Sequence, residues 1–188
     1  MSDNPKHGPD RFFVVTGGPG SGKTTLIETL KAAGIRTSEE VGRRLIRDQQ
    51  AIGGRALPWL DRALFAEMML CLEMRNHDVA TAQPGTILFD RGVPDVIGYL
   101  NLIGLPVPHH MTVAARTLRY NRRVFIAPPW PEIYRTDGER RQDLDEAERT
   151  YTAMVRTYRQ YGYDLVELPR VPVGERADFV MAVIRAEA

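Results

Sequence analysis

The sequence predicts a three-layer α/β fold in which one parallel β-sheet lies between two layers of helices. Five short apolar segments favour buried strands, and they alternate along the chain with longer segments of helical periodicity. These strand segments are residues 12–16, 35–38, 86–90, 123–127 and 164–168. A glycine-rich segment, residues 17–24, directly follows the first strand and leads into a helix. Strands connected through helices pair in parallel with right-handed crossovers, so both faces of this sheet should be covered.

Glycine and proline mark most of the expected helix boundaries. Gly34 ends the helix that follows the glycine-rich segment, and the pair Gly53-Gly54 ends the next one. Pro58 suits the first turn of a long amphipathic helix that stops before Pro84. Further helices are expected at residues 94–103, 109–120 and 143–160, and from about residue 174 onward.

The length and composition favour a single globular domain. The chain has 188 residues, of which 43% are hydrophobic, and this is enough for a substantial core. We expect residues 1–10 to form a flexible N-terminal tail and residues 11–188 to form one domain. The polar tail does not resemble a signal peptide, and no apolar run reaches the roughly 18 residues of a membrane span. These observations predict a cytoplasmic protein, a monomer or homodimer, with no membrane partner.

Charge and cysteine content exclude other classes. Basic and acidic side chains nearly balance, 25 against 24, so nucleic acid is not an expected partner. Cys71 is the single cysteine, which rules out a disulfide within the chain. Its apolar helical surroundings predict a packed rather than a reactive thiol. The four histidines are not spaced as metal ligands on one helical face.

The glycine-rich segment is predicted to bind nucleotide phosphates. It matches the pattern G-x-x-x-x-G-K-[ST], in which backbone N–H groups and a helix N-terminus surround the phosphates. Lys23 would contact the β- and γ-phosphates, and the hydroxyl of Thr24 would ligate Mg²⁺. The expected nucleotide-binding residues here are Gly17, Gly18, Pro19, Gly20, Ser21, Gly22, Lys23, Thr24 and Thr25.

Charged residues follow the other strands at the sheet edge where ligands of parallel α/β folds bind. Asp90 ends an apolar strand, a pattern typical of a carboxylate that holds Mg²⁺ directly or through water. Arg91 could donate two parallel hydrogen bonds to an anionic acceptor or to the phosphoryl group in transfer. The alternatives are a solvated acid for Asp90 and a structural ion pair for Arg91.

Glu40 and Arg43 lie about one helical turn apart, after the second strand. Glu40 could accept the proton of an attacking hydroxyl, or it could simply be an acid favoured by the helix dipole. Glu39 is the alternative if the register differs by one residue. We expect Glu40, Arg43 and Arg91 to bind the acceptor.

The segment after the fourth strand is a candidate lid. Arg135, Arg140 and Arg141 lie in a loop that contains Gly138, and such a loop can fold over the phosphates and exclude water. Arg140 and Arg141 would meet the charge of the transition state, and Arg135 would bind the nucleotide. A merely solvated loop is the alternative.

Together these motifs resemble the kinase branch of P-loop NTPases. More closely, the chain is similar to a small AAA-type family of predicted ATPases related to the nicotinamide riboside kinase domain of NadR, over residues 11–186. The resemblance implies the strand order 2-3-1-4-5, an arginine-bearing lid after the fourth strand, a base-contacting loop at 169–173, and Mg-ATP as phosphoryl donor. Gly92 follows Arg91, so the compact Asp-Arg-[Tyr/His] triplet of thymidylate kinases is absent, and the resemblance leaves the acceptor open.

The sequence therefore predicts a Mg-ATP-dependent phosphotransferase, a small-molecule kinase with a nucleoside- or nucleotide-like acceptor. Lys23, the Mg²⁺ ion held by Thr24 and Asp90, and the lid arginines would carry the transfer. Either Glu40 or Asp90 would orient the acceptor hydroxyl. The alternative is a nucleotide-dependent regulatory protein that hydrolyses ATP or GTP slowly and signals through lid closure. The guanine-specific pattern N/T-K-x-D is absent, which argues against a conventional GTPase but leaves GTP binding open.

Overall fold

The structure is a computed structural model that describes residues 8–133 and 144–187. Five strands form one parallel sheet in the order β2-β3-β1-β4-β5, which confirms the predicted fold class and strand order. The strands are β1 (Phe12–Gly17), β2 (Arg36–Thr37), β3 (Ile87–Asp90), β4 (Arg123–Ala127) and β5 (Asp164–Glu167).

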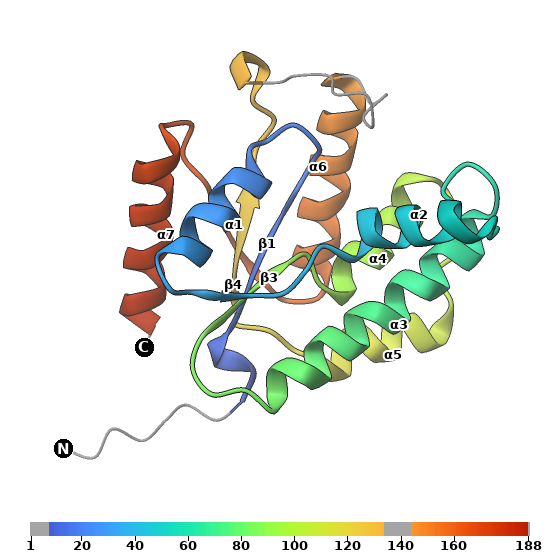
Figure 1. Cartoon of the computed structure of the whole chain (residues 1–188), viewed down its shortest axis with the longest axis horizontal. Helices are drawn as coiled ribbons and strands as arrows, with labels where there is room; N and C mark the ends of the chain where they lie inside the picture. The colour runs from blue at the N-terminus through green and yellow to red at the C-terminus, as the bar shows by residue number, and fades with distance from the viewer. Residues whose placement is uncertain (1–7, 134–143, 188) are drawn as a thin grey trace.

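Helices cover the sheet on both faces and extend beyond one of its edges (Figure 1). The α-helices of the described residues are α1 (Lys23–Ala32), α2 (Val41–Ile52), α3 (Arg62–Thr81), α4 (Val93–Leu102), α5 (His109–Thr117), α6 (Leu144–Gln160) and α7 (Val173–Glu187). Short 3₁₀ turns occur at η1 (Pro9–Arg11) and η2 (Pro131–Ile133). None of these helices is long and apolar enough to cross a membrane, as far as the described residues show.

The alternation of side chains along β1 divides the core into two layers. Phe13 and Val15 pack with residues of α1 and α7, such as Leu26 and Val180. Phe12 and Val14 point to the opposite face, where α6 contributes to the packing. Because the first four residues of β1 are at most 2% exposed, the strand that leads into the glycine-rich loop is fully enclosed.

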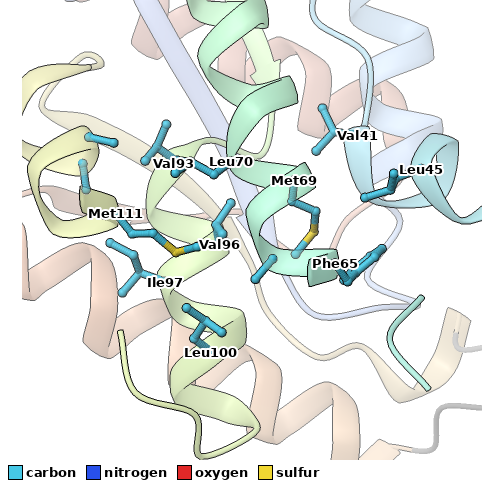
Figure 2. Packing of buried hydrophobic residues seen from close by; sticks show 13 residues of the cluster. Val41, Leu45, Phe65, Met69, Leu70, Val93, Val96, Ile97, Leu100 and Met111 are labelled. Carbon is cyan, nitrogen blue, oxygen red and sulfur yellow. The ribbon is translucent and has the colours of Figure 1, made fainter. Parts of the chain in front are cut away.

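A third apolar cluster holds α2, α3, α4 and α5 together beside the sheet (Figure 2). Val41 and Leu45 of α2 meet Phe65 and Met69 of α3 in this cluster. These helices place the residues that follow β2 and β3 next to each other, which matters for the site.

Three local expectations were wrong. The long helix α3 begins at Arg62 rather than near Pro58, because the carboxylate of Asp61 accepts a hydrogen bond from Leu64 N at 3.0 Å and caps the helix there. Helix α5 ends at Thr117 rather than at residue 120, since Tyr120 turns into the core and is only 3% exposed. Cys71 is exposed rather than packed, because one residue beyond the buried Leu70 the helix has turned by about 100°.

Candidate active site

The phosphate loop follows β1, the central strand, and is held between α6 and α7. Gly22 has φ 75°, a left-handed conformation that suits glycine, and α1 begins directly after it at Lys23. A Cβ atom on Gly18 would lie 2.5 Å from the backbone oxygen of Ala147 in α6. From α7, Arg176 donates to the backbone oxygen of Ser21 at 3.1 Å, and this buried arginine was not found by sequence reasoning. The loop therefore has little freedom to change its shape.

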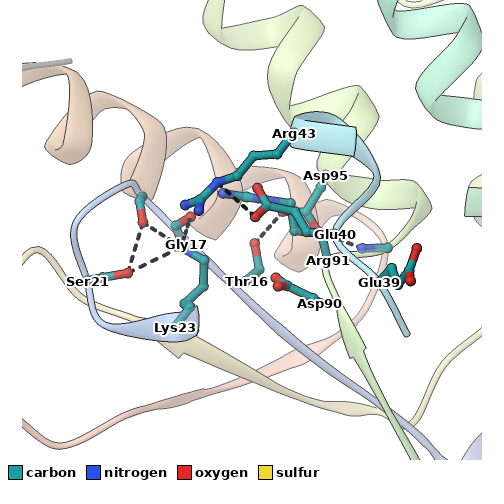
Figure 3. A network of polar contacts seen from close by, with 12 residues as sticks. Thr16, Gly17, Ser21, Lys23, Glu39, Glu40, Arg43, Asp90, Arg91 and Asp95 are labelled. Carbon is teal, nitrogen blue, oxygen red and sulfur yellow. Dashed lines mark hydrogen bonds and ion pairs between the residues drawn. The ribbon is translucent and has the colours of Figure 1, made fainter. Parts of the chain in front are cut away.

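Lys23 lies across the loop that precedes it (Figure 3). Its ammonium group donates to Gly17 O at 3.1 Å, to Gly18 O at 2.5 Å and to Ser21 Oγ at 3.2 Å. Burial, together with the positive charge of Arg91, lowers the pKa of Lys23 to about 7. Thr24 and Thr25, in the next two positions, are exposed.

Asp90 ends β3 and is buried, with 7% exposure. Its Oδ1 has no hydrogen-bond partner among the described residues. Burial, reinforced by the negative charge of Glu40, raises the pKa of Asp90 to about 6. A buried carboxylate oxygen without a donor is costly unless a cation meets it, so this residue fits a Mg²⁺ ligand.

Glu40, Arg43 and Arg91 come together beside Asp90, as the sequence predicted (Figure 3). Glu40 pairs with Arg43 Nε at 3.1 Å and lies 3.8 Å from Arg91 Nε. Glu39 instead pairs with Arg44 at 2.8 Å, and its side chain is 74% exposed. Of the two glutamates that the sequence left open, Glu40 is therefore the one in the cluster.

The structure adds two buried acids that sequence reasoning missed. Asp95 is 6% exposed and bonds to Arg91 Nη1 at 3.0 Å. Glu73 of α3 is 1% exposed, and its Oε2 has no hydrogen-bond partner in the described part of the chain. Burial and the nearby charges of Asp95 and Asp90 raise the pKa of Glu73 well above its ordinary value, which favours the neutral acid. The signal for Asp95 was its place three residues after Gly92, where an acid caps a helix.

Arg135, Arg140 and Arg141, the predicted lid arginines, lie outside the described residues. Their contribution to the site stays a prediction. Within the described residues, the candidate site consists of the phosphate loop with Lys23, Asp90, and the cluster of Glu40, Arg43 and Arg91.

The chain is similar in fold to several solved kinase structures. NadR in complex with NR matches with a TM-score of 0.72 at 18% identity, over 95% of this chain and 52% of that chain. Deoxyadenosine kinase from M. mycoides matches at 0.68 and 14% identity, over 93% of this chain and 99% of that chain. Thymidylate kinase from Ehrlichia chaffeensis matches at 0.61 and 14% identity, over 92% of this chain and 97% of that chain. The chain thus spans about half the length of NadR. No curated protein matches the sequence.

The strand order and these likenesses show an α/β fold of the kind seen in these solved structures. A family model described as an AAA domain matches residues 12–176. The chain belongs to this AAA-domain family. The predicted resemblance to P-loop kinases and NadR is confirmed at the level of the fold.

Proposed function

We propose that the protein is a Mg-ATP-dependent phosphotransferase, a small-molecule kinase with a nucleoside- or nucleotide-like acceptor. The observation that supports it best is Asp90, a buried carboxylate near the phosphate loop with an oxygen that has no hydrogen-bond partner among the described residues. A strand-end acid that served only as a solvated surface group would not be buried in this way.

The nucleotide would bind along the phosphate loop. Backbone N–H groups of residues 17–25 would surround the phosphates, and Lys23 would exchange its contacts with loop oxygens for contacts with phosphate oxygens. Thr24 and Asp90 would hold Mg²⁺, whose chemistry when bound is to neutralise charge on the phosphates.

The acceptor would lie on the side of Glu40, Arg43 and Arg91. Glu40 is 21% exposed and could take the proton of an acceptor hydroxyl, while the two guanidinium groups that it contacts keep it in position. Arg91, 20% exposed, has further N–H donors that could reach the phosphoryl group. A kinase would need such an acceptor side, whereas a protein that transfers phosphate only to water would not.

The ligands of the similar solved structures support a nucleoside- or nucleotide-like acceptor. The solved structures contain NR in NadR, and dCMP and dCDP in deoxyadenosine kinase. Each belongs to the nucleoside or nucleotide class, and we extend that class to this chain as part of the proposal.

The lid arginines complete the proposal. We expect Arg140→Ala and Arg141→Ala to lower kcat more than ATP affinity, because groups that act only in the transition state leave ground-state binding unchanged. Steady-state kinetics and equilibrium binding of ATP would separate the two effects. A loss confined to affinity would make these arginines ordinary binding residues.

The test is product detection with γ-labelled ATP and a panel of nucleosides, nucleoside monophosphates and vitamin-like alcohols, with and without Mg²⁺. Transfer of label to an acceptor, abolished without Mg²⁺ and in Lys23→Ala, is the expected result. Loss of label only to water, with no acceptor stimulating it, would overturn the kinase and favour a nucleotide-dependent regulator.

A further inference from the structure

Asp95 joins groups from separate parts of the site through a single carboxylate (Figure 3). Its Oδ1 accepts from Thr16 Oγ1 at 2.5 Å and from Arg91 Nη1 at 3.0 Å. Its Oδ2 accepts from Gly92 N at 3.0 Å and from Tyr158 Oη at 2.5 Å. Two carboxylate oxygens offer enough lone pairs for all four donors, whereas an amide would turn an N–H group toward two of them.

Helix capping explains only one of these bonds. Asp95 caps α4 through the N–H of Gly92, and a neutral polar side chain would serve that purpose as well. Thr16, by contrast, directly precedes the phosphate loop, and Arg91 directly follows Asp90. The extra bonds therefore connect α4 to the two strand ends that form the candidate active site.

Arg91 has an unusual backbone that needs such support. It is the one non-glycine residue with positive φ, 74°, in the described part of the chain. A left-handed conformation is unfavourable for a residue with a Cβ atom, and surrounding contacts must hold it. Asp95 bonds the guanidinium of Arg91 at 3.0 Å, while Glu40 is more distant at 3.8 Å, so Asp95 is the closer anchor.

Tyr158 extends the connection to α6. Its ring is fully buried and its hydroxyl donates to Asp95 Oδ2. The same helix touches the phosphate loop, where Ala147 lies against Gly18. One helix thus contacts both the loop and the carboxylate that holds Arg91.

We propose that Asp95 is a positioning residue that fixes the guanidinium of Arg91 for phosphoryl transfer and keeps it in register with the phosphate loop. The inference rests on the proposed function, because it assigns Arg91 to the transferring phosphoryl group. Asp95 itself acts only through Arg91.

The test is a double-mutant cycle with Asp95→Asn and Arg91→Ala. Loss of γ-phosphate from ATP is measured both to water and to an acceptor, alongside equilibrium binding of ATP. We expect Asp95→Asn to lower kcat by about 10- to 100-fold in the wild-type background and by less than about threefold in Arg91→Ala. ATP affinity should change little. Asp61→Asn, which makes the same change at the cap of α3, should leave kcat unchanged.

Tyr158→Phe provides a second cycle that does not depend on the folding of Asp95→Asn. It removes one hydrogen bond and keeps the ring, so a smaller loss of kcat that again disappears in Arg91→Ala is expected.

The outcomes separate this inference from the proposed function. An equal loss of kcat in both backgrounds, with acceptor transfer intact in the wild type, would overturn the role of Asp95 and leave the kinase standing. A non-additive loss in ATP hydrolysis without any acceptor transfer would support Asp95 and overturn the kinase. A wild-type protein that consumed no ATP under either condition would overturn both.

Discussion

At the scale of residues, the site contains a buried cation, Lys23, and a buried carboxylate, Asp90, whose charges act on each other. Burial lowers the pKa of Lys23 and raises that of Asp90, and each is also shifted by the charge of the other in the direction that favours ionisation. A nucleotide with Mg²⁺ would supply the negative and the positive partner respectively. The site thus holds charges that the protein alone stabilises poorly.

Lys23→Ala should reduce turnover by about 10²- to 10³-fold, because the cation that meets the phosphates is lost. Circular dichroism should show an intact fold, since within the described residues Lys23 bonds only to its own loop. A variant that retained wild-type turnover would place the chemistry elsewhere.

The same variant has a predicted pH signature in its stability. Between pH about 7 and 10.5 the unfolded chain holds the lysine proton and the folded chain does not, so wild-type stability rises across this window relative to Lys23→Ala. The free energy of unfolding of Lys23→Ala, relative to that of the wild type, should therefore be highest at pH 7 and below. Thermal unfolding of both proteins at pH 6 and pH 9 measures this difference.

Asp90 predicts a pH dependence of activity. Because the carboxylate must be ionised to hold Mg²⁺ and its pKa is raised to about 6, kcat/KM for Mg-ATP should rise with pH through that value. Asp90→Asn should be weakly active, without this rise. It should also be more stable than the wild type above pH 6, where the folded protein must hold the desolvated charge. A variant that kept the wild-type pH profile would assign the titration to another group.

At the scale of elements, the contact between the phosphate loop and α6 sets the position of both. Gly18→Ala would drive a Cβ atom to 2.5 Å from Ala147 O, so the loop or the helix must move. We expect a loss of about 1–3 kcal/mol in the free energy of unfolding, with weaker ATP binding. Denaturant unfolding and equilibrium binding of ATP measure the two effects.

Gly174→Ala is the matched control, since nothing lies within 4 Å of the added Cβ atom and the residue is helical in α7. It should leave ATP binding unchanged and stability unchanged or up to about 1 kcal/mol higher. Equal effects of the two substitutions would show that the loop tolerates displacement from α6.

The helices and strands also show how much of the fold could be predicted from the sequence. The strands and most helices were predicted because apolar periodicity and glycine and proline signals agree with the fold. The start of α3 was misplaced because two signals compete, the ring of Pro58 and the carboxylate of Asp61, and only the structure shows which one caps the helix. Tyr158 could not be found, since its hydroxyl meets Asp95 across 63 positions of sequence separation and no local pattern marks that bond.

At the scale of the whole molecule, nucleotide binding should be visible as thermal stabilisation. A ligand at 100 times its dissociation constant stabilises the folded state by about 2.7 kcal/mol, equivalent to roughly 5–10 °C in Tm for a chain of this size. Mg-ATP should therefore raise the Tm of the wild type, and much less that of Lys23→Ala, in a thermal shift assay. An equal rise in both proteins would argue against binding through Lys23.

The site as a whole was predictable to the extent that it lies at strand ends. Glu40, Asp90 and Arg91 were predicted because parallel strands bring their carboxyl ends to one edge. Glu73 was not predicted, because it comes from the middle of α3 rather than from a strand end. A single charged residue in an apolar helical pattern does not indicate whether it is buried or exposed, and Glu73 is buried.

The sheet order has a last consequence for motion. β1 and β3, which carry the phosphate loop and Asp90, each pair with strands on both sides, while β2 and β5 form the edges. Amide hydrogen exchange is slowest where opening requires disruption of the whole molecule, and interior strands are such places. Fraying at β5 would leave these two strands paired, so the spacing between the start of the phosphate loop and Asp90 should persist for as long as the chain stays folded.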